Sequence, residues 1–107
     1  MYKQLTHNEL EQLIQDCEIL VIADVRDQES FDEAHIKSAV HLSMPMLQEF
    51  CEESDKAQPI VVYCYHGVSS QSVAQHLIEQ GFTEVYSLIG GFETWKEHHP
   101  TSADASH

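Results

Sequence analysis

Cys64 is the residue whose type and position most strongly indicate chemistry. It ends an apolar run over residues 60–64 (IVVYC) and precedes a short polar loop, after which the pattern becomes helical. A thiol between the carboxyl end of a buried strand and the amino end of the next helix meets unpaired N–H groups and the positive end of the helix dipole. Both favour the thiolate, which is the nucleophilic form. The sequence therefore predicts a reactive thiol rather than a cysteine that only packs in the core.

The loop after the cysteine has the composition of an anion-binding turn. Gly67 and two serines let the backbone curl so that successive N–H groups converge on one anionic atom. The predicted binding groups are the backbone N–H groups, with added serine hydroxyls, of Tyr65, His66, Gly67, Val68, Ser69 and Ser70. Cysteine phosphatases need an arginine about six residues after the nucleophile to clamp a phosphoryl group, and this chain has serine there. A small, soft group such as a sulfane sulfur suits a site held by backbone dipoles alone.

Other polar residues favour structural roles. Asp24 and Arg26 end a predicted strand near the same edge, and an Asp-x-Arg there is typical of a hydrogen-bonded structural pair, although a catalytic role stays open. His66 can act as an acid or base, or can simply contribute its backbone N–H. The eight histidines contain no His-x-x-x-His pair, and His98 and His99 are expected to point apart on a helix. No metal site and no cofactor are predicted.

Composition limits the class of protein. A chain of 107 residues with 42% apolar residues fits one domain, expected over residues 1–100 with a flexible tail over residues 101–107. The formal charge of −13 argues against nucleic acid and anionic lipid surfaces as partners. The longest apolar stretch is residues 19–23, far below the roughly 20 residues of a membrane span. With no export signal and no paired cysteines, the expectation is a cytoplasmic protein with reduced thiols.

Alternation of strand and helix patterns predicts the α/β class. Strands are expected over residues 19–23, 39–42, 60–64 and 84–88. Helices are expected from a capping box at Thr6, around residues 28–34, from Pro45, before a stop at Gly81, and from Phe92 to Pro100. Such crossovers give a mostly parallel central sheet of about five strands with helices on both faces. Ligands then bind beyond the carboxyl ends of the strands, where the cysteine falls.

Three segments together resemble the single-domain rhodaneses, and among them the GlpE-type thiosulfate sulfurtransferases. Residues 21–27 (VIADVRD), with Phe31 and residues 35–39 (HIKSA), resemble the first signature region of that family. Residues 64–70 (CYHGVSS) resemble its active-site loop, and residues 90–95 (GGFETW) its last signature. The family usually has glycine before the His-Ile pair, whereas this chain has Ala34.

The resemblance implies a single rhodanese-like domain that transfers sulfur. Cys64 would take the outer sulfur of thiosulfate, release sulfite and hold a persulfide, from which an acceptor removes the sulfur. Cyanide would be the assay acceptor and a dithiol such as thioredoxin a cellular one, with ping-pong kinetics and no cofactor. Two alternatives remain: a non-catalytic module that relays persulfide from a partner protein, and a phosphatase or arsenate reductase, which Ser70 disfavours.

Overall fold

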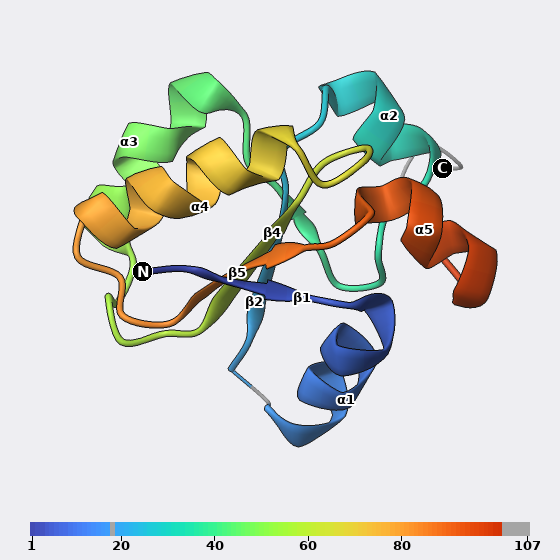
Figure 1. Ribbon diagram of the computed structural model, residues 1–107. Helices are drawn as coiled ribbons and strands as arrows, with labels where there is room; N and C mark the ends of the chain where they lie inside the picture. Colours follow the sequence, from blue (N-terminus) through green and yellow to red (C-terminus); the bar gives the residue numbers. More distant parts are fainter. Residues whose placement is uncertain (18, 102–107) are drawn as a thin grey trace.

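Five parallel strands form one sheet in the order β1-β5-β4-β2-β3 (Figure 1). The computed structural model describes residues 1–17 and 19–101. The strands are β1 (Lys3–Leu5), β2 (Val21–Asp24), β3 (Val40–His41), β4 (Ile60–Tyr63) and β5 (Val85–Leu88). The helices are α1 (His7–Asp16), α2 (Gln28–Glu33), α3 (Met44–Glu53), α4 (Ser69–Glu79) and α5 (Gly91–His98). The predicted α/β class and parallel sheet are confirmed.

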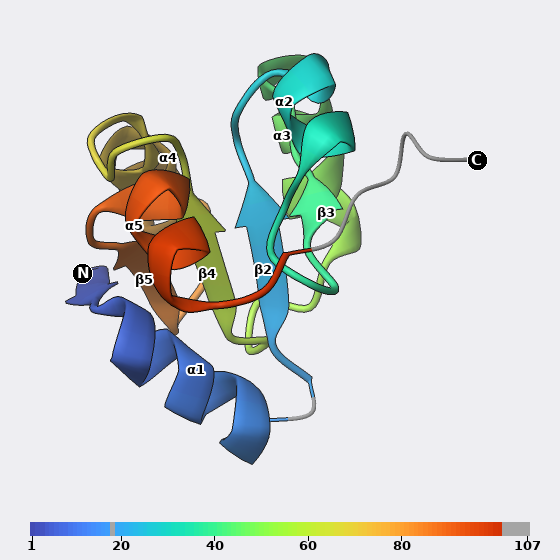
Figure 2. The same cartoon turned by 90° about the vertical axis from the view of Figure 1, so that its right-hand side faces the viewer.

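Two apolar layers hold the helices against the sheet. One layer joins β4 and β5 to α3 and α4, and the other joins the opposite faces of those strands to α1 and α5 (Figure 2). Along β4, Ile60 and Val62 enter the first layer while Val61 and Tyr63 enter the second. This alternation is the period of two of a strand covered on both faces. The central position of β4 therefore follows from its uninterrupted apolar sequence.

The sequence prediction missed one strand and misplaced another. β1 was not located, because its three residues are largely exposed and gain their strand character only by pairing with Tyr86–Leu88 at the edge of the sheet. β2 begins at Val21, two residues after the predicted start. Ile19 lies before the strand and is 63% exposed. Apolarity alone marked the wrong beginning, whereas pairing of Val21 with Ile60 fixes the register.

Helix ends follow the local signals. Thr6 caps α1 in a full capping box with Glu9, as predicted. Gly81, at φ +105°, follows the end of α4 and stops it. The predicted tail lies outside the described residues except for Thr101. Among the described residues, no helix has the length and apolarity that crossing a bilayer requires.

The strand order places a topological switch point between β2 and β4. From β2 the chain moves outward to β3 and then crosses back to β4 on the other side of β2. In open α/β sheets, ligands bind outside the carboxyl ends of the strands at such a switch point. Asp24 ends β2 and Cys64 follows β4, so both lie at this edge.

Candidate active site

Cys64 Sγ accepts hydrogen bonds from the loop that follows it and from the start of α4. The Gly67 N–H donates to Sγ at 3.2 Å and the Ser70 N–H at 3.3 Å. The Cys64 thiol in turn donates to Ser70 Oγ at 3.5 Å. Only 5% of Cys64 is exposed. The Ser70 N–H belongs to the first turn of α4. The strand, loop and helix start therefore meet at the sulfur in the predicted way.

The pKa of the Cys64 thiol lies below its ordinary value. Burial raises this pKa, but hydrogen bonds from the Ser70 hydroxyl and from the N–H groups of Ser70, Gly67 and His66 outweigh burial and lower it. A thiolate gains from each of these donors, whereas a thiol needs none of them. The loop thus favours the nucleophilic form.

The first turn of α5 fixes the loop from its other side. The Phe92 N–H donates to the Cys64 carbonyl at 2.8 Å, and the Glu93 N–H to the Tyr65 carbonyl at 3.0 Å. Because these carbonyls are held by α5, the loop N–H groups are left to face the sulfur. The close contact depends on Gly91, where a Cβ would lie 2.5 Å from the Cys64 carbonyl oxygen.

The predicted loop residues divide into two sets. His66, Gly67 and Ser70 act on the sulfur of Cys64. The other three loop residues have exposed side chains: Tyr65, Val68 and Ser69. Within the described residues, none of these three donates a hydrogen bond to Sγ.

The Tyr65 hydroxyl instead reaches outward and bonds to Asp27 and Ser30 at the start of α2. Asp27 also caps α2 by accepting from the Ser30 N–H. These bonds connect the loop to the neighbouring helix, and we expect them to limit its movement.

Asp24 and Arg26 form a buried, hydrogen-bonded ion pair. Arg26 Nη2 donates to Asp24 Oδ2 at 2.6 Å and to the Ala34 carbonyl at 2.6 Å, and its guanidinium carbon lies 4.2 Å from the centre of the Phe92 ring. Ala34 has an extended backbone at φ −167°, which any residue adopts, so the missing glycine changes nothing here. The pair ties β2 to α5 beneath the site without contacting Sγ.

Sequence reasoning missed Ser87 on β5. Its hydroxyl lies 2.8 Å from Ser70 Oγ, and both residues are buried. The available signal was a serine in the otherwise apolar strand 85–88, on the same face as Val85 and hence toward α4.

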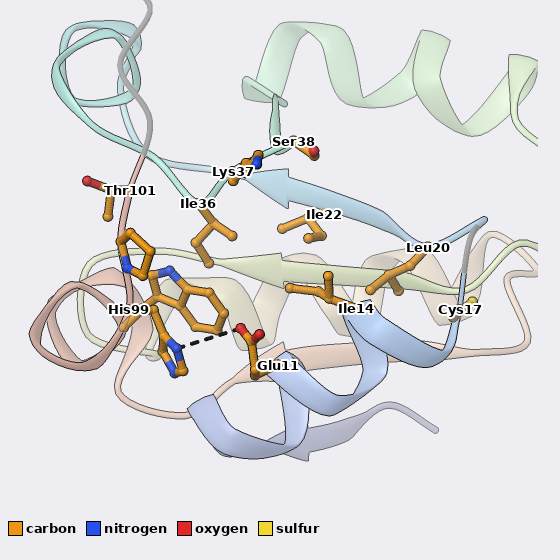
Figure 3. Close-up of a pocket in the computed structure, with 12 residues that line it drawn as sticks. Glu11, Ile14, Cys17, Leu20, Ile22, Ile36, Lys37, Ser38, His99 and Thr101 are labelled. Atoms are coloured by element: carbon orange, nitrogen blue, oxygen red, sulfur yellow. Dashed lines mark ion pairs between the residues drawn. The ribbon is translucent and has the colours of Figure 1, made fainter.

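A cavity of about 730 Å³ lies elsewhere, between α1, α5 and residues 36–38 (Figure 3). Ile14, Ile22 and Ile36 form an apolar wall, and Glu11 pairs with His99 at 3.6 Å. Cys64 is not among the residues that line it, so this cavity is separate from the candidate site.

The histidines show where spacing misled. His98 and His99 were expected to point apart, yet both rings contact His7 from α1, at centroid distances of 4.0 Å and 5.2 Å. Over residues 1–17 and 19–101, no three His, Cys, Asp or Glu side chains are grouped so that they could hold a metal ion.

Known proteins are similar to this chain in sequence and in fold. The family model for the rhodanese-like domain matches residues 6–98. A protein of Coxiella burnetii named thiosulfate sulfurtransferase GlpE is 68% identical over 102 residues, covering 95% of this chain and 94% of that protein. A protein of the same name from Shewanella oneidensis is 46% identical and covers 90% of this chain and 94% of its own length.

Solved structures agree in fold. The crystal structure of the Alr3790 protein from Anabaena superposes with a TM-score of 0.84 at 24% identity, covering 92% of this chain and 91% of that one. The crystal structure of the BH2092 protein from Bacillus halodurans superposes with a TM-score of 0.83 at 26% identity, covering 96% of this chain and 78% of that one. The family match, the near full-length relatives and the parallel sheet agree with the three sequence signatures, and the chain belongs to the rhodanese-like domain family.

Proposed function

We propose that this protein is a thiosulfate sulfurtransferase that carries one sulfur atom on Cys64. The observation that supports this most directly is the buried thiol whose pKa is lowered by the hydrogen bonds of its own loop. The relatives from Coxiella burnetii and Shewanella oneidensis carry the name of that activity. The lowered pKa increases the thiolate fraction, and the thiolate is what attacks sulfur.

The reaction proceeds in two half-reactions. The Cys64 thiolate attacks the outer sulfur of thiosulfate, a new S–S bond forms, and the bond to the sulfonate sulfur breaks so that sulfite leaves with the electron pair. The resulting persulfide anion is then attacked at its outer sulfur by an acceptor, which regenerates the Cys64 thiolate. With cyanide the product is thiocyanate, and we propose a dithiol of the thioredoxin type as the cellular acceptor. Such double displacement gives ping-pong kinetics.

The loop backbone takes the place of a charged clamp. Thiosulfate and the persulfide are anionic, while the chain as a whole carries a formal charge of −13. Donors aimed at the developing charge stabilise it without a cation. We assign this role to the N–H groups of Tyr65, His66, Gly67, Val68 and Ser69, with the N–H and hydroxyl of Ser70; the groups that do not reach Sγ are available to the outer sulfur.

Two other functions make different predictions. A relay module would accept persulfide from a partner protein and would not sustain turnover with thiosulfate as the only donor. A phosphatase would need a cation at position 70, where the structure has a fully buried serine. For either sulfur function we propose the cytoplasm as the location, because the three free cysteines suit a reducing compartment.

The experiment is intact-mass measurement after incubation with thiosulfate and without an acceptor. We expect one added sulfur that a reductant removes, and loss of both the adduct and thiocyanate production in Cys64→Ser. Cys17→Ser is the matched control and should retain both, although Cys17 is the more exposed thiol. An adduct that persists in Cys64→Ser would overturn the assignment. An adduct without steady turnover on thiosulfate would favour the relay module.

A further inference from the structure

Two buried serine hydroxyls extend the hydrogen-bond network of Cys64 into the sheet. Ser70 is 0% exposed and Ser87 is 1% exposed. Ser70 Oγ lies 3.5 Å from Cys64 Sγ and 2.8 Å from Ser87 Oγ, so the three side chains form a line from the reactive sulfur to β5. A buried hydroxyl without a hydrogen bond costs free energy. We therefore ask which group in this line donates to which.

Counting protons shows what changes when the thiol ionises. A serine hydroxyl has one proton to donate and can accept as well. While Cys64 is a thiol, it donates to Ser70, which leaves the Ser70 proton free to be donated to Ser87. Once Cys64 is a thiolate it can only accept, so the Ser70 proton turns toward Sγ and the Ser87 hydroxyl donates to Ser70 in its place. The whole line reverses, and every hydroxyl stays paired.

We infer that Ser87 is a positioning residue for the reactive thiolate. Its hydroxyl holds the Ser70 oxygen in place and, by donating to it, directs the Ser70 proton to the sulfur. Without Ser87, the Ser70 hydroxyl would lose its partner 2.8 Å away, and nothing would direct its proton to the sulfur. Bonds in such a chain also strengthen one another in a buried setting. Ser87 does not touch Sγ and is not catalytic.

This inference deepens the proposed function, because the sulfur-transfer reaction needs the thiolate both as nucleophile and as leaving group. The role of Ser87 and the sulfur-transfer function can be refuted separately. The ionisation of Cys64 is measured without thiosulfate or acceptor, so it tests the hydroxyl line whether or not the protein transfers sulfur.

The test is the pKa of Cys64, obtained from the pH dependence of alkylation by iodoacetamide, with the modified peptide quantified by mass spectrometry. Ser87→Thr and Ser87→Val are a matched pair, because threonine and valine have the same shape and differ by the hydroxyl. We expect Ser87→Val to have a pKa higher by about one unit, which is about tenfold less thiolate below the pKa, and Ser87→Thr to stay near the parent protein. Ser72→Ala removes an exposed hydroxyl from α4, the helix that carries Ser70, and should leave the pKa of Cys64 unchanged.

A second comparison tests the route through Ser70. In a Ser70→Ala protein, Ser87→Val and Ser87→Thr should give the same pKa, because the intermediate hydroxyl is gone. If valine and threonine at position 87 give equal pKa values in the parent protein, or if their difference persists without the Ser70 hydroxyl, the inference is wrong. Equal pKa values with a loss of thermal stability would leave Ser87 only a structural role.

Discussion

Replacing Asp24 by asparagine tests whether the Asp24–Arg26 pair supports the fold or the reaction. Asp24 is 0% exposed, and its carboxylate accepts from the Arg26 backbone N–H at 2.9 Å, from Nε at 3.0 Å and from Nη2 at 2.6 Å. Asparagine keeps the shape but removes the charge that balances the guanidinium. Arg26, itself 7% exposed, would keep uncharged partners such as the Ala34 carbonyl and the rings of Phe92, Tyr63 and Tyr65.

The expected loss is large for a domain of this size. Breaking a buried ion pair by removing one partner costs about 3–5 kcal/mol, since the other charge stays buried without compensation. Domains unfold with about 5–15 kcal/mol in total, so Asp24→Asn should remove a substantial share of the stability. Removing both charges in Asp24→Asn with Arg26→Met should cost less than the sum of the two single losses.

Urea denaturation followed by circular dichroism measures these losses. Asp16→Asn, at an exposed aspartate, is the control and should change the free energy of unfolding by less than about 0.5 kcal/mol. Folded Asp24→Asn should keep the alkylation pKa of Cys64, because neither member of the pair contacts Sγ. A variant that loses less than about 1 kcal/mol yet no longer transfers sulfur would refute the structural role and indicate a catalytic one.

Two further predictions concern the surroundings of the loop. Gly91→Ala should destabilise by about 1–3 kcal/mol more than Gly81→Ala in the same urea assay. Both glycines have positive φ, but a Cβ at Gly91 lies 2.5 Å from the Cys64 carbonyl oxygen, whereas at Gly81 the nearest atoms are 4.0 Å away; equal losses would contradict the steric argument. The Tyr65 hydroxyl, with the Ser30 N–H and hydroxyl, lowers the pKa of Asp27 from 3.8 to about 2, so the stability this carboxylate contributes is present above pH 3.8 and is lost as the pH falls through about 2. In Tyr65→Phe the midpoint of the Asp27 carboxyl, followed by NMR, should rise toward 3.8, and an unchanged midpoint would show that Tyr65 is not the cause.

Local signals predicted most of the elements. The apolar run that became β4 is buried on both faces, so its sequence needs no alternation and is easy to identify. The capping box at Thr6 and the stop at Gly81 depend on neighbours in the sequence and were found for that reason. β1 and the start of β2 were not, because pairing with distant strands decides them.

The same division applies to the site. The position of Cys64 between a strand and a helix was predictable because the strand end, the glycine and the helix start are contiguous in the sequence. Ser87 was not, since nothing in residues 85–88 indicates that its hydroxyl meets Ser70 from another element. The grouping of His7 with His98 and His99 was missed for a related reason, as α1 and α5 are adjacent only in the folded chain.

The sequence by itself determined the class of fold, the position of the candidate nucleophile Cys64 and the serine at position 70. These depend on residue type and on spacing within a few positions, where backbone geometry is nearly fixed. Only the tertiary structure decided which N–H groups reach the sulfur. It also decided that the first turn of α5 binds the loop carbonyls and that the Ser87 hydroxyl contacts that of Ser70. Those contacts join β4, β5, α4 and α5, and the distances between such elements are set by how their side chains pack.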